Sequence, residues 1–343
     1  MRKVKAEEAI GMVLGHDVTR IVPGQFKGAV LKKGHIIQEG DIPLLLDTGN
    51  DYIYVLGLQK GELHENEAGM RLARAVAGPG IALAPPEEGK VSLRAQGKGL
   101  LRIDVPLLAR INSLEDIIIS TLHDHTPCQE GMTVAAVRII PLTIAEEKIK
   151  AVEDTCKGHT MINILSYTLQ KIGVVVTGNE VYHGRIKDSF DEMLGGKVSE
   201  YGATVVRKLI APDEAEEIAS ALLQAKDMGA EVLITTGGLS IDPGDVTRMG
   251  IQKAGAEVIS YGAPVLPGAM FLYALLDGIP VLGLPACVFY AKTTIFDLIF
   301  PRVLAGETIT REAIIKMGHG GLCSECEVCR FPICPFGKGE TGG

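Results

Sequence analysis

Short apolar runs alternate with segments of helical spacing through the carboxyl-terminal half of the chain. Residues 172–176 are apolar on both faces of the expected strand, which is typical of a parallel sheet covered on both sides. Similar runs follow at residues 203–210, 231–235, 256–261 and 279–284. Segments with helical periodicity lie between most of them, at residues 189–201, 213–228, 245–254 and 287–304. This alternation predicts an α/β domain over residues 168–310, with a three-layer, doubly wound and mostly parallel sheet.

The amino-terminal part has a different pattern, in which short apolar runs are separated by turn-forming residues. We predict strands at residues 28–31, 35–37, 51–56 and 134–142, helical segments at 42–46, 66–77 and near 113–122, and a loop at 78–99. These elements predict a smaller, mixed β-rich region over residues 1–150 that points to no particular function. The change of pattern places a domain break between Thr143 and Lys171. A glycine- and cysteine-rich tail over residues 317–343 lacks the apolar periodicity needed for a core of its own.

Length and charge narrow the class of protein. At 343 residues the chain is long enough for two domains. Its net charge of -8, without a clustered basic run, argues against a nucleic-acid partner. The amino terminus lacks the apolar segment of a signal peptide, and the apolar stretch 268–300 is too interrupted to span a membrane. Seven cysteines without a disulfide-like distribution indicate a reducing compartment, so we expect a cytoplasmic protein.

Glycine and polar residues gather where three of the expected strands end, and ligands of open α/β sheets bind at such carboxyl ends. The three groups are Thr177, Gly178, Asn179 and Glu180 with Gly184 and Asp188; Thr236, Gly237, Gly238 and Ser240 with Asp245; and the turn at Pro285.

This arrangement favours an anion site with a metal ion. Gly237 and Gly238 would let backbone N–H groups approach a phosphate, and a helix amino terminus adds a favourable dipole. Asp188 and Asp245 are oxygen ligands of the kind that Mg²⁺ takes when it is shared with a substrate phosphate. The alternative is that the glycines only form tight turns and the aspartates only cap helices. Three such groups at successive strand ends favour the ligand site, because turns alone do not require paired acids.

The same segments resemble a known domain family. VVVTGNEVYHGRIKDSF, LITTGGLSIDPGDVTR, YGAPVLPG and PVLGLPA are similar to the molybdopterin-binding domain of the molybdopterin adenylyltransferases, molybdopterin molybdenumtransferases and competence-damage-inducible proteins. The resemblance covers about 135 residues. It implies that Asp188 and Asp245 lie beside the pterin phosphate and that the Gly237-Gly238 loop, with Pro267, Gly268 and Pro285 from the other matching segments, holds the ligand. It also implies a pterin ligand, molybdate, Mg²⁺, a homo-oligomer and, as a further partner, a molybdoenzyme.

Three departures from the family pattern bear on activity. Molybdenumtransferases show Lys-Pro-Gly-Lys-Pro where this chain has Leu266-Pro267-Gly268-Ala269 preceded by valine, so both lysines are missing. They show Gly-Leu-Pro-Gly-Asn-Pro where this chain has Gly-Leu-Pro-Ala-Cys-Val, and their amino-terminal Met-Asp-Gly-Tyr-Ala is absent. The loss of two cations weakens the expected hold on molybdate or phosphate.

The tail carries a second candidate site. Cys323, Cys326, Cys329 and Cys334 follow a Cys-x2-Cys-x2-Cys-x4-Cys-Pro pattern, one residue longer than the bacterial ferredoxin spacing, and predict an iron–sulfur cluster. Zinc with four thiolates is the alternative, and His319 is a candidate replacement for one of them.

Two further groups of residues are candidates for a functional role, and each also has a purely structural explanation. Cys287, near the start of a helix, is either a thiol with a depressed pKa that meets molybdenum or a small buried side chain. The histidines of His123-Asp124-His125 are either metal ligands or part of a solvated loop, and His183 lies in the first ligand loop.

Three functions are compatible with these observations. The first is a molybdenum-cofactor enzyme that binds molybdopterin or its adenylate with Mg²⁺ and inserts molybdenum. The second is a non-catalytic molybdopterin carrier that delivers cofactor to a molybdoenzyme through its cysteine tail. The third is a nucleotide or pyrophosphate hydrolase similar to the competence-damage-inducible proteins.

Overall fold

The structure is a computed structural model that describes residues 2–22, 26–56, 60–87, 89–240 and 244–339. Of the predicted tail, residues 340–343 lie outside the described part. The chain forms two compact units: Met1–Arg94, Pro106–Leu122 and Met132–Ile162 make the first, and Ala95–Val105, His123–Gly131 and Asn163–Gly343 make the second. Two short segments of the predicted region 1–150 thus belong to the second unit. Independent folding of the parts stays a prediction.

The amino-terminal end of the first unit has its own apolar core. Its elements are β1 (Arg2–Lys5), η1 (Ala6–Glu8), β2 (Val13–Leu14), β3 (Val18–Val22), β4 (Phe26–Leu31), η2 (Glu39–Asp41), α1 (Ile42–Asp47) and β5 (Tyr52–Leu56). Strands in the order β1-β5-β2 form an antiparallel sheet, and β3 and β4 form a hairpin. Leu14, Leu45 and Val55 are completely buried in this core. The predicted strand at 35–37 is reduced to an isolated bridge at Ile36.

The rest of the first unit is a four-stranded antiparallel sheet with helices. Its elements are β6 (Glu62–His64), α2 (Glu65–Val76), β7 (Ile81–Leu83), β8 (Val91–Ala95), α3 (Val105–Asn112), β10 (Ile117–Thr121), β12 (Thr133–Ile139), β13 (Thr143–Ala145) and α4 (Glu146–Cys156). The sheet has the order β10-β12-β8-β7, and β13 pairs with β6. Arg71 of α2 donates two hydrogen bonds of 2.8 Å to Glu153 of α4, which joins the two helices.

Two predictions for this unit were wrong. The segment near 113–122 contains the strand β10 instead of a helix, because its β-branched residues alternate between buried and exposed positions and pair with β12. The helix is α3, which lies earlier and has Pro106 in its first turn, where a missing N–H costs little. The loop expected over residues 78–99 contains β7 and β8, and β8 buries every second side chain.

The second unit is built on a six-stranded sheet of the predicted kind. Its strands are β15 (Lys171–Thr177), β16 (Thr204–Ala211), β17 (Val232–Thr236), β18 (Glu257–Tyr261), β19 (Leu272–Leu276) and β20 (Ile279–Leu284), in the order β16-β15-β17-β20-β19-β18. The first four in this order run parallel, and β19 is antiparallel to both of its neighbours. The α/β class and the mostly parallel sheet are therefore confirmed. Three short strands, β9 (Gly99–Ile103), β11 (Pro127–Cys128) and β14 (Ile162–Leu165), form a separate small sheet.

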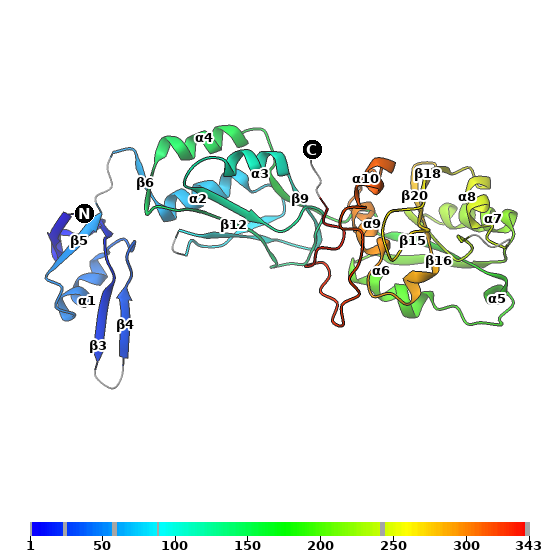
Figure 1. The fold of residues 1–343 in the computed structure, drawn as a ribbon, viewed down its shortest axis with the longest axis horizontal. Helices are drawn as coiled ribbons and strands as arrows, with labels where there is room; N and C mark the ends of the chain where they lie inside the picture. Colours follow the sequence, from blue (N-terminus) through cyan, green and yellow to red (C-terminus); the bar gives the residue numbers. More distant parts are fainter. Residues whose placement is uncertain (1, 23–25, 57–59, 88, 241–243, 340–343) are drawn as a thin grey trace. The chain divides into compact units, whose positions relative to one another are not determined.

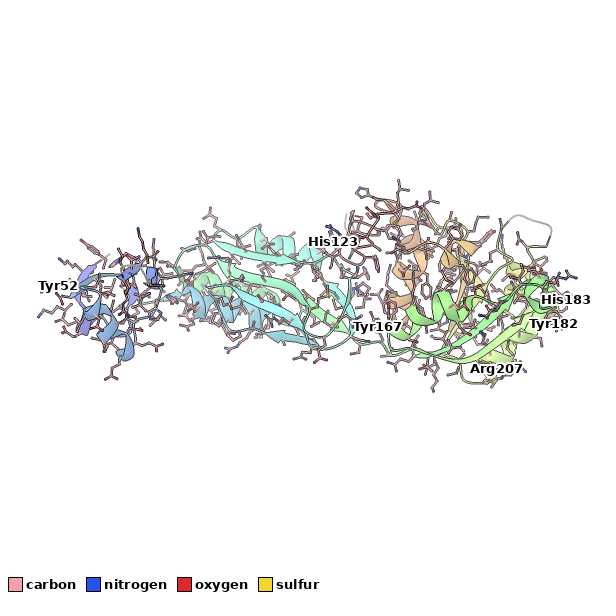
Figure 2. All side chains as sticks on the ribbon, turned by 90° about the horizontal axis from the view of Figure 1, so that it is seen from below. Tyr52, His123, Tyr167, Tyr182, His183 and Arg207 are labelled. Atoms are coloured by element: carbon pink, nitrogen blue, oxygen red, sulfur yellow. The ribbon has the colours of Figure 1, made fainter. Side chains whose placement is uncertain are left out.

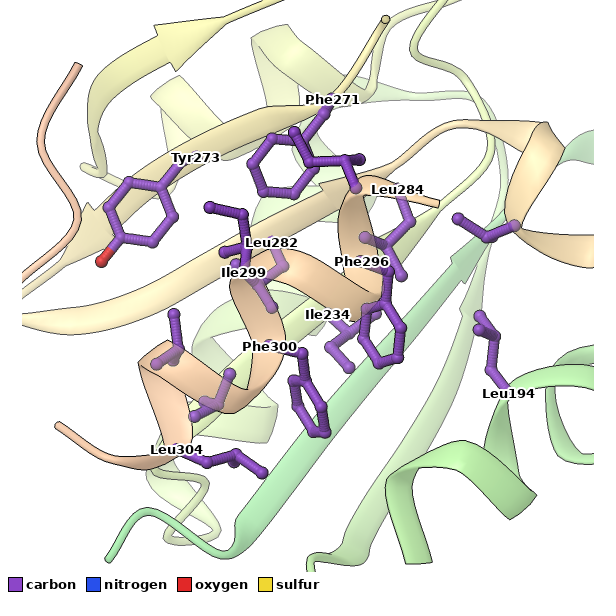
Figure 3. Packing of buried hydrophobic residues seen from close by; sticks show 14 of the residues in the cluster. Leu194, Ile234, Phe271, Tyr273, Leu282, Leu284, Phe296, Ile299, Phe300 and Leu304 are labelled. Carbon is purple, nitrogen blue, oxygen red and sulfur yellow. The ribbon is translucent and has the colours of Figure 1, made fainter. Parts of the chain in front are cut away.

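Helices cover both faces of this sheet. They are α5 (Asn179–Tyr182), η3 (Asp191–Gly195), α6 (Gly196–Glu200), α7 (Ala215–Asp227), α8 (Thr247–Lys253), η4 (Ala286–Phe289), α9 (Ile295–Leu304) and α10 (Arg311–Lys316). α6 and α9 lie to one side of β15 and β20, and α7 and α8 lie to the other (Figure 1). Phe296 and Phe300 of α9 are stacked at 4.6 Å between ring centroids and face Ile234 of β17 (Figure 3). The three-layer prediction is confirmed.

The last predicted helix, residues 287–304, is not continuous. Residues 286–289 form a single 3-10 turn, and α9 begins only after Thr294. Thr294 and Asp297 form a capping box at that point, with 2.7 Å between the Thr294 nitrogen and an Asp297 oxygen. The capping box starts a new helix because it satisfies N–H groups that a continuous helix would bond internally. None of the described helices is long and apolar enough to cross a membrane.

The tail packs against the rest of the second unit, to which it belongs. Phe336 is only 3% exposed and joins the same apolar cluster as α9. Lys338 donates a hydrogen bond to the Thr126 hydroxyl, and burial lowers the pKa of Lys338. The tail therefore packs its apolar side chain into the core of the α/β sheet domain instead of forming a core of its own.

Glu307, which follows α9, is the centre of an ion-pair group. It accepts a hydrogen bond of 2.7 Å from Arg302 and pairs with Arg102 and His125. Burial of the carboxyl opposes ionisation, but His125 and Arg302 outweigh it and lower the pKa of Glu307 to about 2.

Candidate functional site

The ends of three parallel strands stand next to one another in the second unit. Val176 of β15 pairs with Thr236 of β17, and Thr236 pairs with Leu284 of β20. Neighbouring strands lie about 4.8 Å apart, so the loops that follow them leave the same edge of the sheet. The sequence prediction that these three loops meet is consistent with this register.

A cavity of about 690 Å³ lies at this edge, within the range of about 300–1,000 Å³ that ligand pockets have. Eight of the residues predicted for the strand-end site line it: Glu180, Gly237, Gly238, Ser240, Asp245, Pro267, Gly268 and Pro285; Cys323, predicted for the tail site, lines it as well. The other predicted residues of the strand-end loops, Thr177, Gly178, Asn179, Gly184, Asp188 and Thr236, are not among its lining residues. The cavity therefore divides the predicted residues into those that face a ligand space and those that support the loops.

The two loop glycines are required by the protein packed behind them. Gly237 has φ +92° and a Cβ there would lie 2.5 Å from the carbonyl oxygen of Thr177. Gly238 has φ +58° and a Cβ there would lie 2.4 Å from the hydroxyl of Thr247. Both positions thus need glycine for the fold itself, before any ligand is considered.

Buried threonines lie behind the Gly237-Gly238 loop and form hydrogen bonds with one another. The Thr177 hydroxyl donates to the carbonyl oxygen of Thr236 at 3.0 Å and lies 2.9 Å from the Thr247 hydroxyl. All three residues are buried. The hydroxyls of Thr177 and Thr247, together with the backbone carbonyl of Thr236, therefore support the Gly237-Gly238 loop.

Asp188 is held by its own neighbours. One of its carboxylate oxygens accepts a bond of 2.8 Å from the backbone N–H of Phe190, and the other accepts one of 2.8 Å from Lys208. Lys208 of β16 also pairs with Asp191. Burial opposes the charge on Lys208, but the two carboxylates raise its pKa. These bonds tie Asp188 to the segment before η3 and to β16.

The first loop is shaped by short local bonds. The backbone N–H of Asn179 donates to Asp213 at 2.9 Å, and the side-chain oxygen of Asn179 accepts from the backbone of Asp213 at 3.3 Å. Gly178 and Gly184 take φ values of +139° and +67°. These three positions set the path of the loop, and Glu180 is its member in the cavity.

Several lining residues were not predicted. They are Leu239, Leu266, Ala269, Met270, Ala286, Tyr290, Leu322 and Glu325, whereas Cys287 and Cys323, both candidates from the sequence, also line the cavity. Most are apolar, and no local pattern distinguishes an apolar side chain that lines a cavity from one that fills a core. Leu322, Cys323 and Glu325 come from the tail, whose return to the sheet the sequence pattern does not show.

The charge of the cavity is acidic. Glu180, Asp245 and Glu325 contribute carboxylates, and none of the described residues that line it is a lysine or an arginine. This agrees with the two lysines missing from the loop at Pro267 and Gly268. Three carboxylates repel an anion, so a cation bound beside them would favour its binding.

The histidine and Cys287 candidates are placed as follows. His183 follows α5 and lies edge-on against Tyr182 at 5.3 Å between centroids, outside the cavity (Figure 2). His125 belongs to the group around Glu307. Burial raises the pKa of the Cys287 thiol, contrary to the depressed pKa considered from its position near a helix start. As arranged in the described part of the chain, no three His, Cys, Asp or Glu side chains are grouped closely enough to hold a metal ion.

Comparisons with known proteins concern the domain that contains this cavity. Residues 173–305 match the family model described as a probable molybdopterin binding domain, so the resemblance deduced from the sequence is confirmed for this segment. Residues 3–57 match a domain of unknown function.

Individual relatives are similar over limited stretches. The molybdopterin molybdenumtransferase of Haemophilus influenzae is 26% identical over 144 residues, which are 40% of this chain and 35% of that protein. A CinA-like protein of Amoebophilus asiaticus is 35% identical over 80 residues, 23% of this chain and 19% of that protein. The chain thus spans about a fifth to a third of the length of the curated relatives that it matches. A solved molybdopterin biosynthesis protein from Pyrococcus horikosii is 14% identical, with a TM-score of 0.34 over 89% of this chain and 74% of that one.

Proposed function

We propose that the chain, through its domain of the molybdopterin-binding type at residues 173–305, binds molybdopterin and takes part in assembly of the molybdenum cofactor. The observation that carries the proposal is the cavity of about 690 Å³ in which the three strand-end loops of this domain meet. It combines a glycine loop, carboxylates and an apolar wall, as a pocket for a phosphorylated pterin requires.

Mg²⁺ is the cation that fits the oxygen donors of this cavity. Mg²⁺ is usually held by one or two carboxylates together with water and substrate phosphate, so a complete protein cage is not needed. Asp245 and Glu180 are the carboxylates that we assign to it, with the Ser240 hydroxyl beside them. When bound, the ion supplies the positive charge that the missing lysines would otherwise provide for a phosphate.

The chain's own residues bind and orient the ligand. The loop from Gly237 to Ser240 and the turn at Pro285 form the part of the cavity next to the sheet, and Leu266 and Met270 provide apolar contact area. Such positioning is the contribution that a protein makes when two reactants, here the dithiolene and molybdate, must meet in a fixed geometry.

Two activities of this site remain as proposals. Insertion of molybdenum is the enzymatic one, supported by the resemblance to the molybdenumtransferases. Carriage of molybdopterin without turnover is the second, supported by the acidic cavity without lysine, which gives molybdate little electrostatic attraction. Turnover of adenylated pterin with molybdate separates the enzyme from the carrier, and nucleotide or pyrophosphate hydrolysis is measured in the same preparation.

The test of binding starts with mass spectrometry of ligands that stay on the natively purified full chain. Titration with the retained pterin follows, in Mg²⁺ and in EDTA. We expect Asp245→Asn and Glu180→Gln to weaken Mg²⁺-dependent binding by at least about tenfold, or about 1.4 kcal/mol.

Asp188→Asn is the matched control, because Asp188 lies outside the cavity lining and is bonded to Lys208. We expect its affinity to stay within about twofold of the parent, with a loss of stability instead. If Asp188→Asn and Asp245→Asn weaken binding equally, Asp188 is a ligand-binding residue and its use as a control is wrong. If Asp245→Asn and Glu180→Gln fold and bind the pterin with the affinity of the parent, the assignment of the cation to these carboxylates is refuted.

A further inference from the structure

A second cavity of about 340 Å³ lies beside the first, under the tail of the chain. All four tail cysteines line it: Cys323, Cys326, Cys329 and Cys334. Cys326 and Cys329 are exposed, while Cys323 and Cys334 are half-buried, and all four are free thiols. Cys323 and Cys334 also pack against the apolar cluster of the second unit, but packing does not explain the exposed Cys326 and Cys329.

The backbone of this segment is loosely tied. Its start is fixed by the N–H of Cys323, which donates to the Leu266 carbonyl at 2.8 Å. Between Ser324 and Pro332, a lysine side chain that donates to the Glu327 carbonyl oxygen provides a further tie, at 2.6 Å. Helices and strands are absent from this described stretch. The sulfur atoms can therefore move together around an ion without breaking a helix or a sheet.

The surroundings of the cavity suit a centre with excess negative charge. Four thiolates around a divalent ion carry a net charge of about −2, and the charged residues that line the same cavity are Lys292 and Arg330 with the single carboxylate of Glu325. The hydroxyl of Thr293 lies 3.1 Å from the sulfur of Cys329. Outer-shell contacts of this kind orient the ligands of metal centres.

We propose that Cys323, Cys326, Cys329 and Cys334 close around one metal centre, and that this centre forms a wall of the ligand cavity. Cys323 lines both cavities, as do Pro267 and Tyr290, so the centre and the ligand space share a boundary. Metal binding replaces the thiol protons and releases them to solvent. The proposal does not depend on the identity of the ligand in the larger cavity.

The first experiment measures metal on the full chain, purified without oxygen. We expect about four iron atoms with matching sulfide per chain and a visible spectrum, as the ferredoxin-like spacing indicates. One equivalent of zinc in a colourless protein would support the site with the other metal. Cys326→Ala and Cys329→Ala are expected to lose at least about tenfold in metal content, because a cluster or zinc ion held by three thiolates dissociates readily.

Cys156→Ala is the matched control, since Cys156 lies in α4 of the other unit, and it should keep the parental metal content. Protein that holds less than about a tenth of an equivalent after reconstitution with iron and sulfide, and separately with zinc, overturns the proposal. Retention of the metal by Cys326→Ala and Cys329→Ala also overturns it.

A second measurement tests the shared wall without any pterin. Leu266 donates to Gly321 and accepts from Cys323, each at 2.8 Å, so this pair of bonds links the tail to the cavity loop. Removal of the metal should speed hydrogen exchange of the Leu266 and Cys323 amides by at least about tenfold, because local opening exposes both bonds. Unchanged exchange at both amides in metal-free protein would disprove the structural coupling.

Discussion

Replacement of Gly238 by alanine tests why the site loop carries glycine. A Cβ at this position would lie 2.4 Å from the hydroxyl of Thr247 but 3.4 Å from the hydroxyl of Thr177. Thr247 is fully buried and its hydroxyl lies 2.9 Å from that of Thr177. The Thr247 side chain therefore cannot turn away without leaving buried polar atoms unpaired.

The cost of Gly238→Ala follows from two separate terms. The left-handed backbone at φ +58° costs an alanine about 1–2 kcal/mol. Loss of the buried hydroxyl pair costs about 1–3 kcal/mol more. We therefore expect the free energy of unfolding of the second unit to fall by about 2–5 kcal/mol. In a Thr247→Ala background the clashing oxygen is gone, and the same change should cost only about 1–2 kcal/mol.

The assay is a double-mutant cycle on the full chain. The chain has no tryptophan whose fluorescence could report unfolding, and its two units can unfold separately. Urea unfolding is therefore monitored by hydrogen exchange of peptides from β15 and β17, which report on the second unit alone. The expected coupling between positions 238 and 247 is about 1–3 kcal/mol. An equal cost of Gly238→Ala in both backgrounds refutes the steric reasoning. Parental stability with lost ligand binding would mean instead that the glycine serves the approach of the ligand.

Three further predictions concern the stability of the second unit. The depressed pKa of Glu307 contributes about 3 kcal/mol above pH 4.5 that is lost as the pH falls through about 2, so Glu307→Gln should flatten the acid limb of the stability curve. Phe300→Ala removes a fully buried ring and should cost about 3–5 kcal/mol in urea unfolding, whereas a cost below about 1 kcal/mol would contradict the packing in Figure 3. Burial raises the pKa of Asp297 although Lys197 opposes the shift, so Lys197→Met should destabilise the unit by about 3–5 kcal/mol at pH 8. The loss should be smaller at pH 5, because a raised pKa makes protonation of the unpaired carboxylate easier as the pH falls. The same loss at both pH values would contradict this last prediction.

Local pattern was sufficient for the sheet of the second unit and insufficient for parts of the first. Residues 172–176 and 279–284 are continuous apolar runs between turn residues, so their preference for a covered strand does not depend on distant contacts. Residues 117–121 pair with β12, and that partner lies beyond an intervening loop, so strand pairing overrode the expected helix. The break before α9 came from a side-chain cap that the apolar periodicity of the segment conceals.

The candidate site divides in the same way. The sequence by itself determined that glycine loops and acids follow β15 and β17, because parallel strands must end at a common edge. Tertiary structure alone decided which acids face the cavity: Asp245 lines it, whereas Asp188 is occupied by Lys208 from the neighbouring strand β16. It also decided that the cysteine tail returns to this edge. Both outcomes depend on contacts between residues far apart in the chain, which no local pattern of residue types records.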